Sequence, residues 1–293
     1  MLVSLVQDQH LPVTTRIEGL KALEALQDKT LRHAIDLALH DKEPKLRAEG
    51  CRTLTRVEPA KGLATLEGML SHGTEPEQQG ALRILAEVKT PAADALLSSW
   101  LDKLLSGKVA LPLQLDLLEA AGRRTAAGIK EKLARYEAAR AKDTPLARYR
   151  EALAGGDAES GRKLFLTKYE VSCLKCHKLK GEGGDVGPDL TGIGSRQKRE
   201  YLLESIVDPN KEIAKGFESV VLGLANGQVV AGIVKAEDAK ELKLMTAEAK
   251  LLTVAKKDIE ERTRGKSAMP EDVMKFLTKA ELRDLLEFLA NLK

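Results

Sequence analysis

The sequence predicts a mainly α-helical chain with two parts: a helical repeat domain at residues 1–145 and a second helical domain at residues 146–293 that carries an inserted antiparallel β-sheet. Two observations lead to this fold class. Apolar residues recur at helical spacing through much of the chain, as at Leu20, Leu23 and Leu26. After Phe217 the apolar period changes to two, which is typical of β-strands.

The composition narrows the functions that we expect. A chain of 293 residues can form two or three domains with real cores, and because only 3% of its residues are aromatic, those cores are mostly Leu, Ala, Val and Ile. The formal net charge of +3 is small for this length and does not indicate a nucleic-acid partner. No apolar run approaches the length of a membrane span, and the N-terminus lacks a charged-then-apolar signal segment.

Prolines mark helix starts at a near-constant period in residues 1–145. Pro12, Pro44, Pro76 and Pro112 stand 32, 32 and 36 residues apart. Proline is tolerated in the first turn of a helix, where its missing N–H has no intrahelical partner to lose. The pattern resembles HEAT or armadillo repeats, which implies an α-solenoid with a binding surface. An irregular helical bundle with accidental proline spacing is the alternative.

The second part begins after a break in the helical pattern. Thr144-Pro145 stops one helix, and Gly155-Gly156 marks a hinge. Asp157 is then expected to cap a helix that runs to about Tyr169. We therefore expect the domains at residues 1–145 and 146–293.

The most informative motif is Cys173-Leu174-Lys175-Cys176-His177. The C-x-x-C-H pattern is typical of a c-type haem attachment site, in which the two thiols form thioether bonds and the imidazole lies under the iron. A redox dithiol would also contain C-x-x-C, but it expects a strand before the motif. A structural zinc site needs four ligands, and the C-terminal half has no second Cys or His pair. We expect one haem c, bound through Cys173 and Cys176, with His177 on the iron.

The helices around this motif resemble those of class I cytochromes c. In that family the helix before the motif has a glycine and an aromatic residue four apart, here Gly161 and Phe165, and both meet the C-terminal helix. Thr278 and Glu281 form a capping box for such a helix here. Its apolar stripe is Leu282, Leu285, Leu286 and Leu289, with Phe288 beside it. We expect Phe288 or Leu285 to pack where Gly161 leaves room.

The resemblance also implies the other haem contacts. In cytochromes c a proline after the motif offers its carbonyl to the proximal imidazole, and Pro188 matches it within Gly187-Pro188-Asp189-Leu190. We count Leu190 of this segment among the haem-binding residues. The family's distal ligand is a methionine, often followed by proline, shortly before the last helix. Met269, followed by Pro270, matches that position; Met274 and then Met245 are the alternatives.

Between these two ligands we expect one helix and then the sheet, which occupies about residues 217–262. Ser195 is expected to cap a helix from Arg196 to Val207. Asn226-Gly227 between two β-rich runs predicts a hairpin. Its strands are expected at residues 219–224 and 229–234, with further strands at 241–246 and 251–255 and residues 256–259 trailing, which gives three to five strands.

The haem motif, Gly-Pro-Asp-Leu, Asp208-Pro209 and Ser-x-Met-Pro together are similar to the haem-binding domain of a planctomycete and verrucomicrobial family. In that family the domain follows helical repeats and, in many members, a β-propeller dehydrogenase. The resemblance implies an exported, periplasmic electron carrier, not itself an enzyme, that is the cytochrome portion of a larger protein. It would accept electrons from a dehydrogenase domain or partner and pass them to a respiratory acceptor. The alternative function is a haem-based sensor or ligand-binding protein with a displaceable distal ligand.

Overall fold

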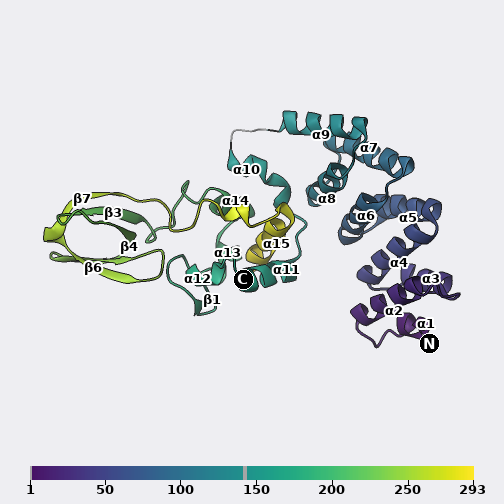
Figure 1. The fold of residues 1–293 in the computed structure, drawn as a ribbon, viewed down its shortest axis with the longest axis horizontal. Helices are drawn as coiled ribbons and strands as arrows, with labels where there is room; N and C mark the ends of the chain where they lie inside the picture. Colours follow the sequence, from purple (N-terminus) through teal and green to yellow (C-terminus); the bar gives the residue numbers. More distant parts are fainter. Residues whose placement is uncertain (1, 141–143) are drawn as a thin grey trace. The chain divides into compact units, whose positions relative to one another are not determined.

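The computed structural model describes residues 2–140 and 144–293. The chain forms two compact units, Met1–Arg140 and Ala141–Lys293 (Figure 1). The sequence predicts this boundary between residues 145 and 146. The first unit is built of helices, and the second combines helices with antiparallel sheets. Over its described residues the chain is mainly helical, as predicted.

The first unit consists of successive helices joined by short turns (Figure 1). Over the described residues they are α1 (Leu2–Gln7), α2 (Val13–Ala25), α3 (Leu31–Leu39), α4 (Pro44–Val57), α5 (Pro59–His72), α6 (Glu75–Glu87), α7 (Pro91–Leu105), α8 (Leu111–Gly122) and α9 (Ala127–Ala139). The predicted proline starts are confirmed, because Pro44, Pro76 and Pro112 lie in the first turns of α4, α6 and α8, and Pro12 immediately precedes α2. Pro59 and Pro91 also open helices, α5 and α7.

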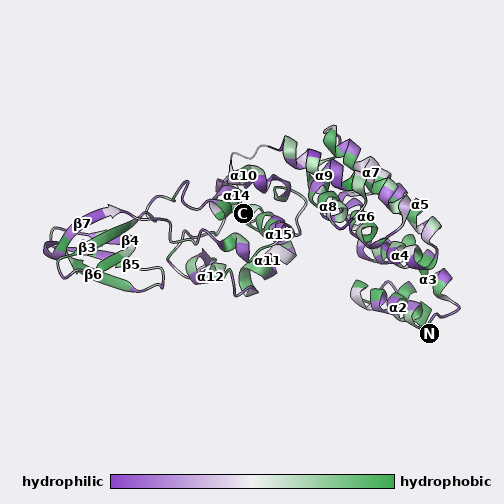
Figure 2. Ribbon diagram, turned by 45° about the horizontal axis from the view of Figure 1, so that its top comes forward, coloured by the Kyte–Doolittle hydropathy of each residue, from purple (hydrophilic) through white to green (hydrophobic). Residues whose placement is uncertain are grey.

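Helices of the first unit pack against their second neighbours as well as their first. The helix α4 contacts both α2 and α6, and α6 contacts α8, while α7 contacts α5 and α9. Ion pairs cross the same joints: Arg47 Nε lies 2.6 Å from Glu77 Oε1 between α4 and α6, and Arg83 joins Asp116 between α6 and α8. Apolar and polar residues alternate along these helices, so that each turns an apolar side inward (Figure 2). Cys51 is fully buried there, as expected of a small apolar side chain.

The second unit has a helical core and an inserted sheet. Its short helices and strands are α10 (Pro145–Arg148), η1 (Arg150–Ala152), α12 (Cys173–Cys176), β1 (Lys178–Leu179), β2 (Glu182–Gly183), α13 (Ile193–Arg196) and η3 (Val273–Lys275). Its longer helices are α11 (Ala158–Thr167), α14 (Arg199–Val207) and α15 (Lys279–Ala290). The helices α11, α14 and α15 enclose the apolar core of this unit.

The crossing of α11 and α15 follows the sequence prediction closely. A Cβ at Gly161 would lie 1.9 Å from the Asp284 carbonyl oxygen and 2.9 Å from Phe288 Cβ, so only glycine allows the helices to come this close. The rings of Phe165 and Phe288 then meet with their centroids 5.5 Å apart. Asp157 caps α11 by accepting a hydrogen bond from the Ser160 N–H at 2.6 Å. The capping box at the start of α15 is also present.

The predicted helix from Arg196 to Val207 is wrong in its first turn. The short helix α13 ends at Arg196, and α14 begins at Arg199 after Lys198, which makes no side-chain cap. Gln197 and Lys198 between the two helices have extended backbones, and a contact distant in sequence holds α13 in place. The Gly194 N–H donates to the Leu292 carbonyl at 2.9 Å, which fixes α13 against the end of α15. On α14, Leu202, Leu203 and Ile206 are buried.

The inserted sheet has five strands in the order β6-β5-β4-β3-β7, all pairs antiparallel. They are β3 (Ser219–Leu224), β4 (Val229–Glu237), β5 (Glu241–Met245), β6 (Leu251–Ala255) and β7 (Ile259–Arg264). The hairpin at Asn226-Gly227 is confirmed by the pairing of Gly223 with Val229. The predicted trailing segment at residues 256–259 instead forms the 3-10 turn η2 (Lys256–Asp258), and β7 begins where that segment ends. Its mostly charged side chains lack an apolar alternation, so its pairing with β3 defines it.

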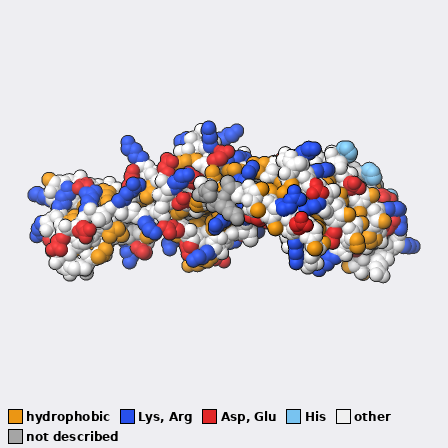
Figure 3. Space-filling view, turned by 90° about the horizontal axis from the view of Figure 1, so that it is seen from above, with side chains coloured by type: hydrophobic (Ala, Val, Ile, Leu, Met, Phe, Trp, Pro, Cys, Tyr) orange, Lys and Arg blue, Asp and Glu red, His pale blue; other side chains and the backbone are white. Residues whose placement is uncertain are grey.

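The sheet has a small core of its own, formed by Leu222, Leu242, Leu244 and Val254. Lys and Arg side chains are interspersed with Asp and Glu over the face of the molecule drawn in Figure 3. Within the described residues, no helix is both long and apolar enough to cross a membrane.

Candidate functional site

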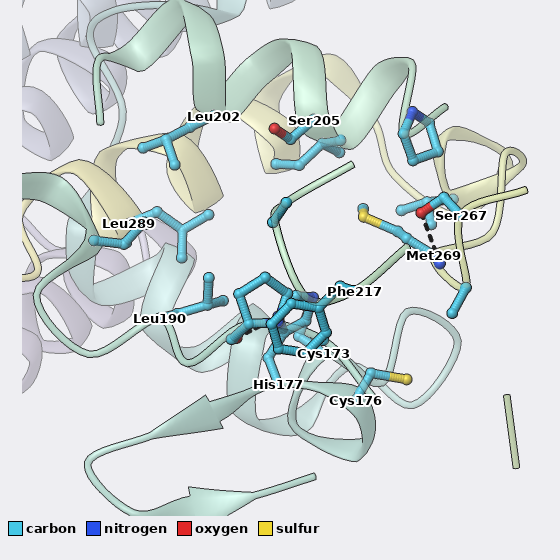
Figure 4. Close-up of a pocket in the computed structure, with 18 of the residues that line it drawn as sticks. Cys173, Cys176, His177, Leu190, Leu202, Ser205, Phe217, Ser267, Met269 and Leu289 are labelled. Atoms are coloured by element: carbon cyan, nitrogen blue, oxygen red, sulfur yellow. Dashed lines mark hydrogen bonds between the residues drawn. The ribbon is translucent and has the colours of Figure 1, made fainter. Parts of the chain in front are cut away.

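The second unit contains an apolar cavity of about 350 Å³, which lies within the roughly 300–1,000 Å³ of ordinary ligand pockets. Its helical walls include Phe165 of α11, Leu202 of α14 and Leu289 of α15. All the site residues predicted from the sequence line this cavity: Cys173, Cys176, His177, Pro188, Leu190 and Met269 (Figure 4). These site residues come from three separate stretches of the chain, 173–177, 188–190 and 269, which therefore meet at one place.

The C-x-x-C-H motif is shaped by a single helical turn. Ser172 precedes it with a left-handed backbone (φ 41°, ψ 46°), and α12 then spans Cys173–Cys176. The His177 N–H donates to the Cys173 carbonyl at 2.9 Å, after which the backbone becomes extended. This turn brings two thiols and one imidazole to the wall of the same cavity.

The imidazole of His177 is held in one orientation. Its Nδ1 lies 2.8 Å from the Pro188 carbonyl oxygen. Because a carbonyl only accepts, Nδ1 carries the proton and Nε2 keeps its lone pair. Gly187 lies against the ring, where a Cβ would be 2.5 Å from His177 Cε1. Burial lowers the pKa of His177 more than the bond to Pro188 raises it, so the ring is neutral and able to bind a metal at neutral pH.

The two thiols do not resemble a reactive dithiol. Burial raises the pKa of Cys173 to about 11 and also raises the pKa of Cys176. Redox-active C-x-x-C thiols have lowered pKa values, because the thiolate is the nucleophile. No group of three or more His, Cys, Asp or Glu side chains that could hold a metal ion occurs among residues 2–140 and 144–293. The thiols, the neutral imidazole and the apolar walls instead fit a covalently held haem.

Met269 lies on the segment between β7 and η3. Its N–H donates to Ser267 Oγ at 3.2 Å. Figure 4 shows its sulfur within the pocket, with His177 on another wall. Of the three methionines considered from the sequence, only Met269 lines the cavity; Met274 packs in the helical core and Met245 ends β5.

Sequence reasoning missed several residues of the cavity wall. Tyr201 of α14 and Phe217, just before β3, line it together with Phe165. Lys235 Nζ lies 4.7 Å from the centroid of the Phe217 ring. The chain has only four Phe and four Tyr, so the scarcity of aromatic residues was a signal that those present could mark a site.

Comparisons with known proteins agree with this geometry. Residues 158–243 match the family model described as Cytochrome c. The chain is 42% identical over 64 residues to the cytochromes c of Cochliobolus lunatus, Arabidopsis thaliana and Stellaria longipes. Those residues are 22% of this chain and 54%, 52% and 54% of the three relatives, so the chain spans about half the length of the curated relatives it matches.

The fold and the residues of the site fit a domain that binds haem covalently. More narrowly, the C-terminal unit contains a cytochrome c domain. A domain of this family implies covalently bound haem c and haem-based electron transfer. The family match ends at residue 243 within β5, so Met269 lies outside it.

Proposed function

We propose that the second unit transfers electrons through one haem c, bound through Cys173 and Cys176 and ligated by His177 and Met269. The observation that carries this proposal is that all four side chains line one apolar cavity. A bound haem supplies an iron that gains and loses one electron. The chain's own residues supply the anchors, the axial ligands and the exclusion of water.

On the proximal side, Pro188 and Gly187 fix the orientation of the His177 imidazole. The hydrogen bond to the Pro188 carbonyl fixes the tautomer and raises the basicity of the free nitrogen. The close contact with Gly187 limits rotation of the ring. A ligand that is already oriented needs little rearrangement when the charge on the iron changes.

On the distal side, the thioether of Met269 would raise the reduction potential relative to a harder ligand. A second axial ligand would also keep the iron six-coordinate in both oxidation states. This favours electron transfer over a sensor, which needs an open or displaceable position. Leu190 contributes apolar surface to the cavity.

The first unit is proposed to be an α-solenoid of HEAT type. The contacts between alternate helices and the ion pairs Arg47–Glu77 and Arg83–Asp116 support it, because stacked two-helix repeats form such contacts. Solenoids usually present a binding surface and carry no chemistry. We propose that this unit docks a partner while the second unit carries electrons.

We further propose that the chain works in the periplasm or another exported location, because haem c attachment takes place outside the cytoplasm in bacteria. The similarity to the planctomycete and verrucomicrobial haem-binding domain supports a dehydrogenase domain or partner protein as electron donor. A respiratory carrier would be the acceptor. In this scheme the chain has no substrate chemistry of its own.

The test is the optical spectrum of the oxidised and reduced protein, wild type and Met269→Ala, with Met274→Ala as the matched control. We expect a six-coordinate low-spin spectrum with a methionine–iron charge-transfer band that Met269→Ala loses and Met274→Ala keeps. A band insensitive to Met269→Ala would exclude this ligand. Rapid carbon monoxide binding to the reduced wild type would favour the sensor function instead. If the purified protein contained no haem, the motif would be interpreted as a pair of free thiols.

A further inference from the structure

The two ends of the inserted sheet are joined beside the cavity. The chain leaves α14, passes Pro209 on the cavity wall and forms the sheet; it then returns at Ser267, which also lines the cavity. Asn210 joins the departing and returning segments. Its Oδ1 accepts a hydrogen bond from the Ser267 N–H at 2.8 Å, across 57 positions of sequence.

The same side chain also holds the returning segment at a second point. Asn210 Nδ2 donates to Glu271 Oε1 at 2.6 Å. Met269 lies midway between Ser267 and Glu271, and its own N–H donates to Ser267 Oγ. One amide group thus holds the chain two residues before and two residues after Met269.

Hydrogen bonds at the base of the sheet, where β3 begins and β7 ends, also hold the returning segment. The Gly265 N–H donates to the Ser219 carbonyl at 2.8 Å, and Ser219 Oγ donates to the Lys266 carbonyl. Between the end of β7 and the start of η3, however, the chain forms no regular structure. Within this irregular stretch, Asn210 connects the segment around Met269 to the residues that follow α14.

We propose that Asn210 is a positioning residue for the distal ligand, which acts by clamping residues 267–271 so that the Met269 thioether stays in the cavity. This inference rests on the proposed ligation by Met269. Its physical basis is conformational entropy: a free segment spreads its side chain over many positions, whereas a clamped one keeps it near the iron. Loss of two hydrogen bonds of ordinary strength would raise the population with Met269 dissociated by about 10- to 100-fold.

The experiment uses the haem-loaded full chain and three variants. Asn210→Ala removes both hydrogen bonds. The double variant Asn210→Asp with Glu271→Gln keeps an acceptor for the Ser267 N–H and reverses the direction of the second bond, so it should restore the clamp. Asn226→Ala is the matched control, because Asn226 lies in the exposed β3–β4 turn and bonds only within it.

We expect Asn210→Ala to weaken the methionine–iron band, to lower the reduction potential and to bind carbon monoxide about 10- to 100-fold faster in the reduced state. Hydrogen exchange at the Ser267 amide should quicken in parallel. The double variant should return these values toward wild type, and Asn226→Ala should leave them unchanged. The inference is overturned if Asn210→Ala matches Asn226→Ala in all four measurements.

A second measurement covers the case in which Asn210→Ala does not retain haem. Ser267→Ala removes the acceptor of the Met269 N–H. Glu271→Ala removes the second hydrogen-bond partner of Asn210 together with the ion pair between Glu271 and Lys266. Each should accelerate carbon monoxide binding by a smaller factor, and wild-type rates in both would refute the clamp. If the wild type itself lacks the methionine band, the proposed ligation and the clamp fail together. If the wild type has the band and Asn210→Ala keeps it, only the clamp fails.

Discussion

Substitution of Gly161 by alanine tests the close crossing of α11 and α15 in the second unit. The added Cβ would lie 1.9 Å from the Asp284 carbonyl oxygen, so α11 and α15 must separate by roughly 1.5 Å to reach ordinary contact. Overpacking of this kind costs about 1–3 kcal/mol or more. Separation also weakens the contact between Phe165 and Phe288, worth about 0.5–1.5 kcal/mol. The better helix propensity of alanine offsets about 1 kcal/mol, which leaves a net loss of about 0.5–3.5 kcal/mol.

The assay is denaturant unfolding with a separate signal for each unit. Haem absorbance follows the second unit, and fluorescence of Trp100, the single tryptophan, follows the first. The matched control is Gly128→Ala in α9, where an added Cβ meets nothing within 4 Å; it should stabilise the first unit by about 0.5–1 kcal/mol. A Gly161→Ala protein whose second unit unfolds within about 0.5 kcal/mol of wild type would refute the reasoning.

Two further predictions concern the site and its helices. In Gly187→Ala, the new Cβ would meet the His177 ring at 2.5 Å, so we expect a displaced imidazole, a lower yield of haem-loaded protein and an altered reduction potential; a wild-type yield and potential would contradict this. A hydrogen bond from Arg199 holds the pKa of Glu287 below its usual value of 4.5. A lowered folded-state pKa contributes stability above the unfolded pKa that is lost as pH falls through the folded one. Glu287→Gln should therefore flatten the fall in stability of the second unit below about pH 4.5; equal slopes for the two proteins would exclude the effect.

The sequence predicts the site well where its determinants are local. Cys173, Cys176 and His177 share one turn, so their spacing alone brings them to the same wall. Pro188 and Met269 were found by their positions relative to the motif and to the last helix. Glycine at residue 161 also carried a clear signal, because a close crossing leaves no room for a side chain.

The features that escaped prediction depend on contacts distant in sequence. The separate helix α13 before α14 is bonded through Gly194 to Leu292, a contact that no local pattern encodes. The strand β7 is defined by its antiparallel pairing with β3. No local pattern marks Asn210, because its partner Ser267 stands 57 positions away.

The long insertion between the two proposed ligands costs little free energy of loop closure. Closing a loop costs only about 0.6 kcal/mol for each doubling of its length. Extending a connection of about seven residues to the 57 positions between Asn210 and Ser267 is about three doublings, or about 2 kcal/mol. The two hydrogen bonds of Asn210 are of the same order, at about 1 kcal/mol each. Leu222, Leu242 and Leu244 give the sheet its own core. Its link to Met269 passes through the clamped segment at its base. A second contact with the cavity wall is made by Lys235 of β4, whose Nζ donates to the Asp185 carbonyl at 2.9 Å and lies over the Phe217 ring.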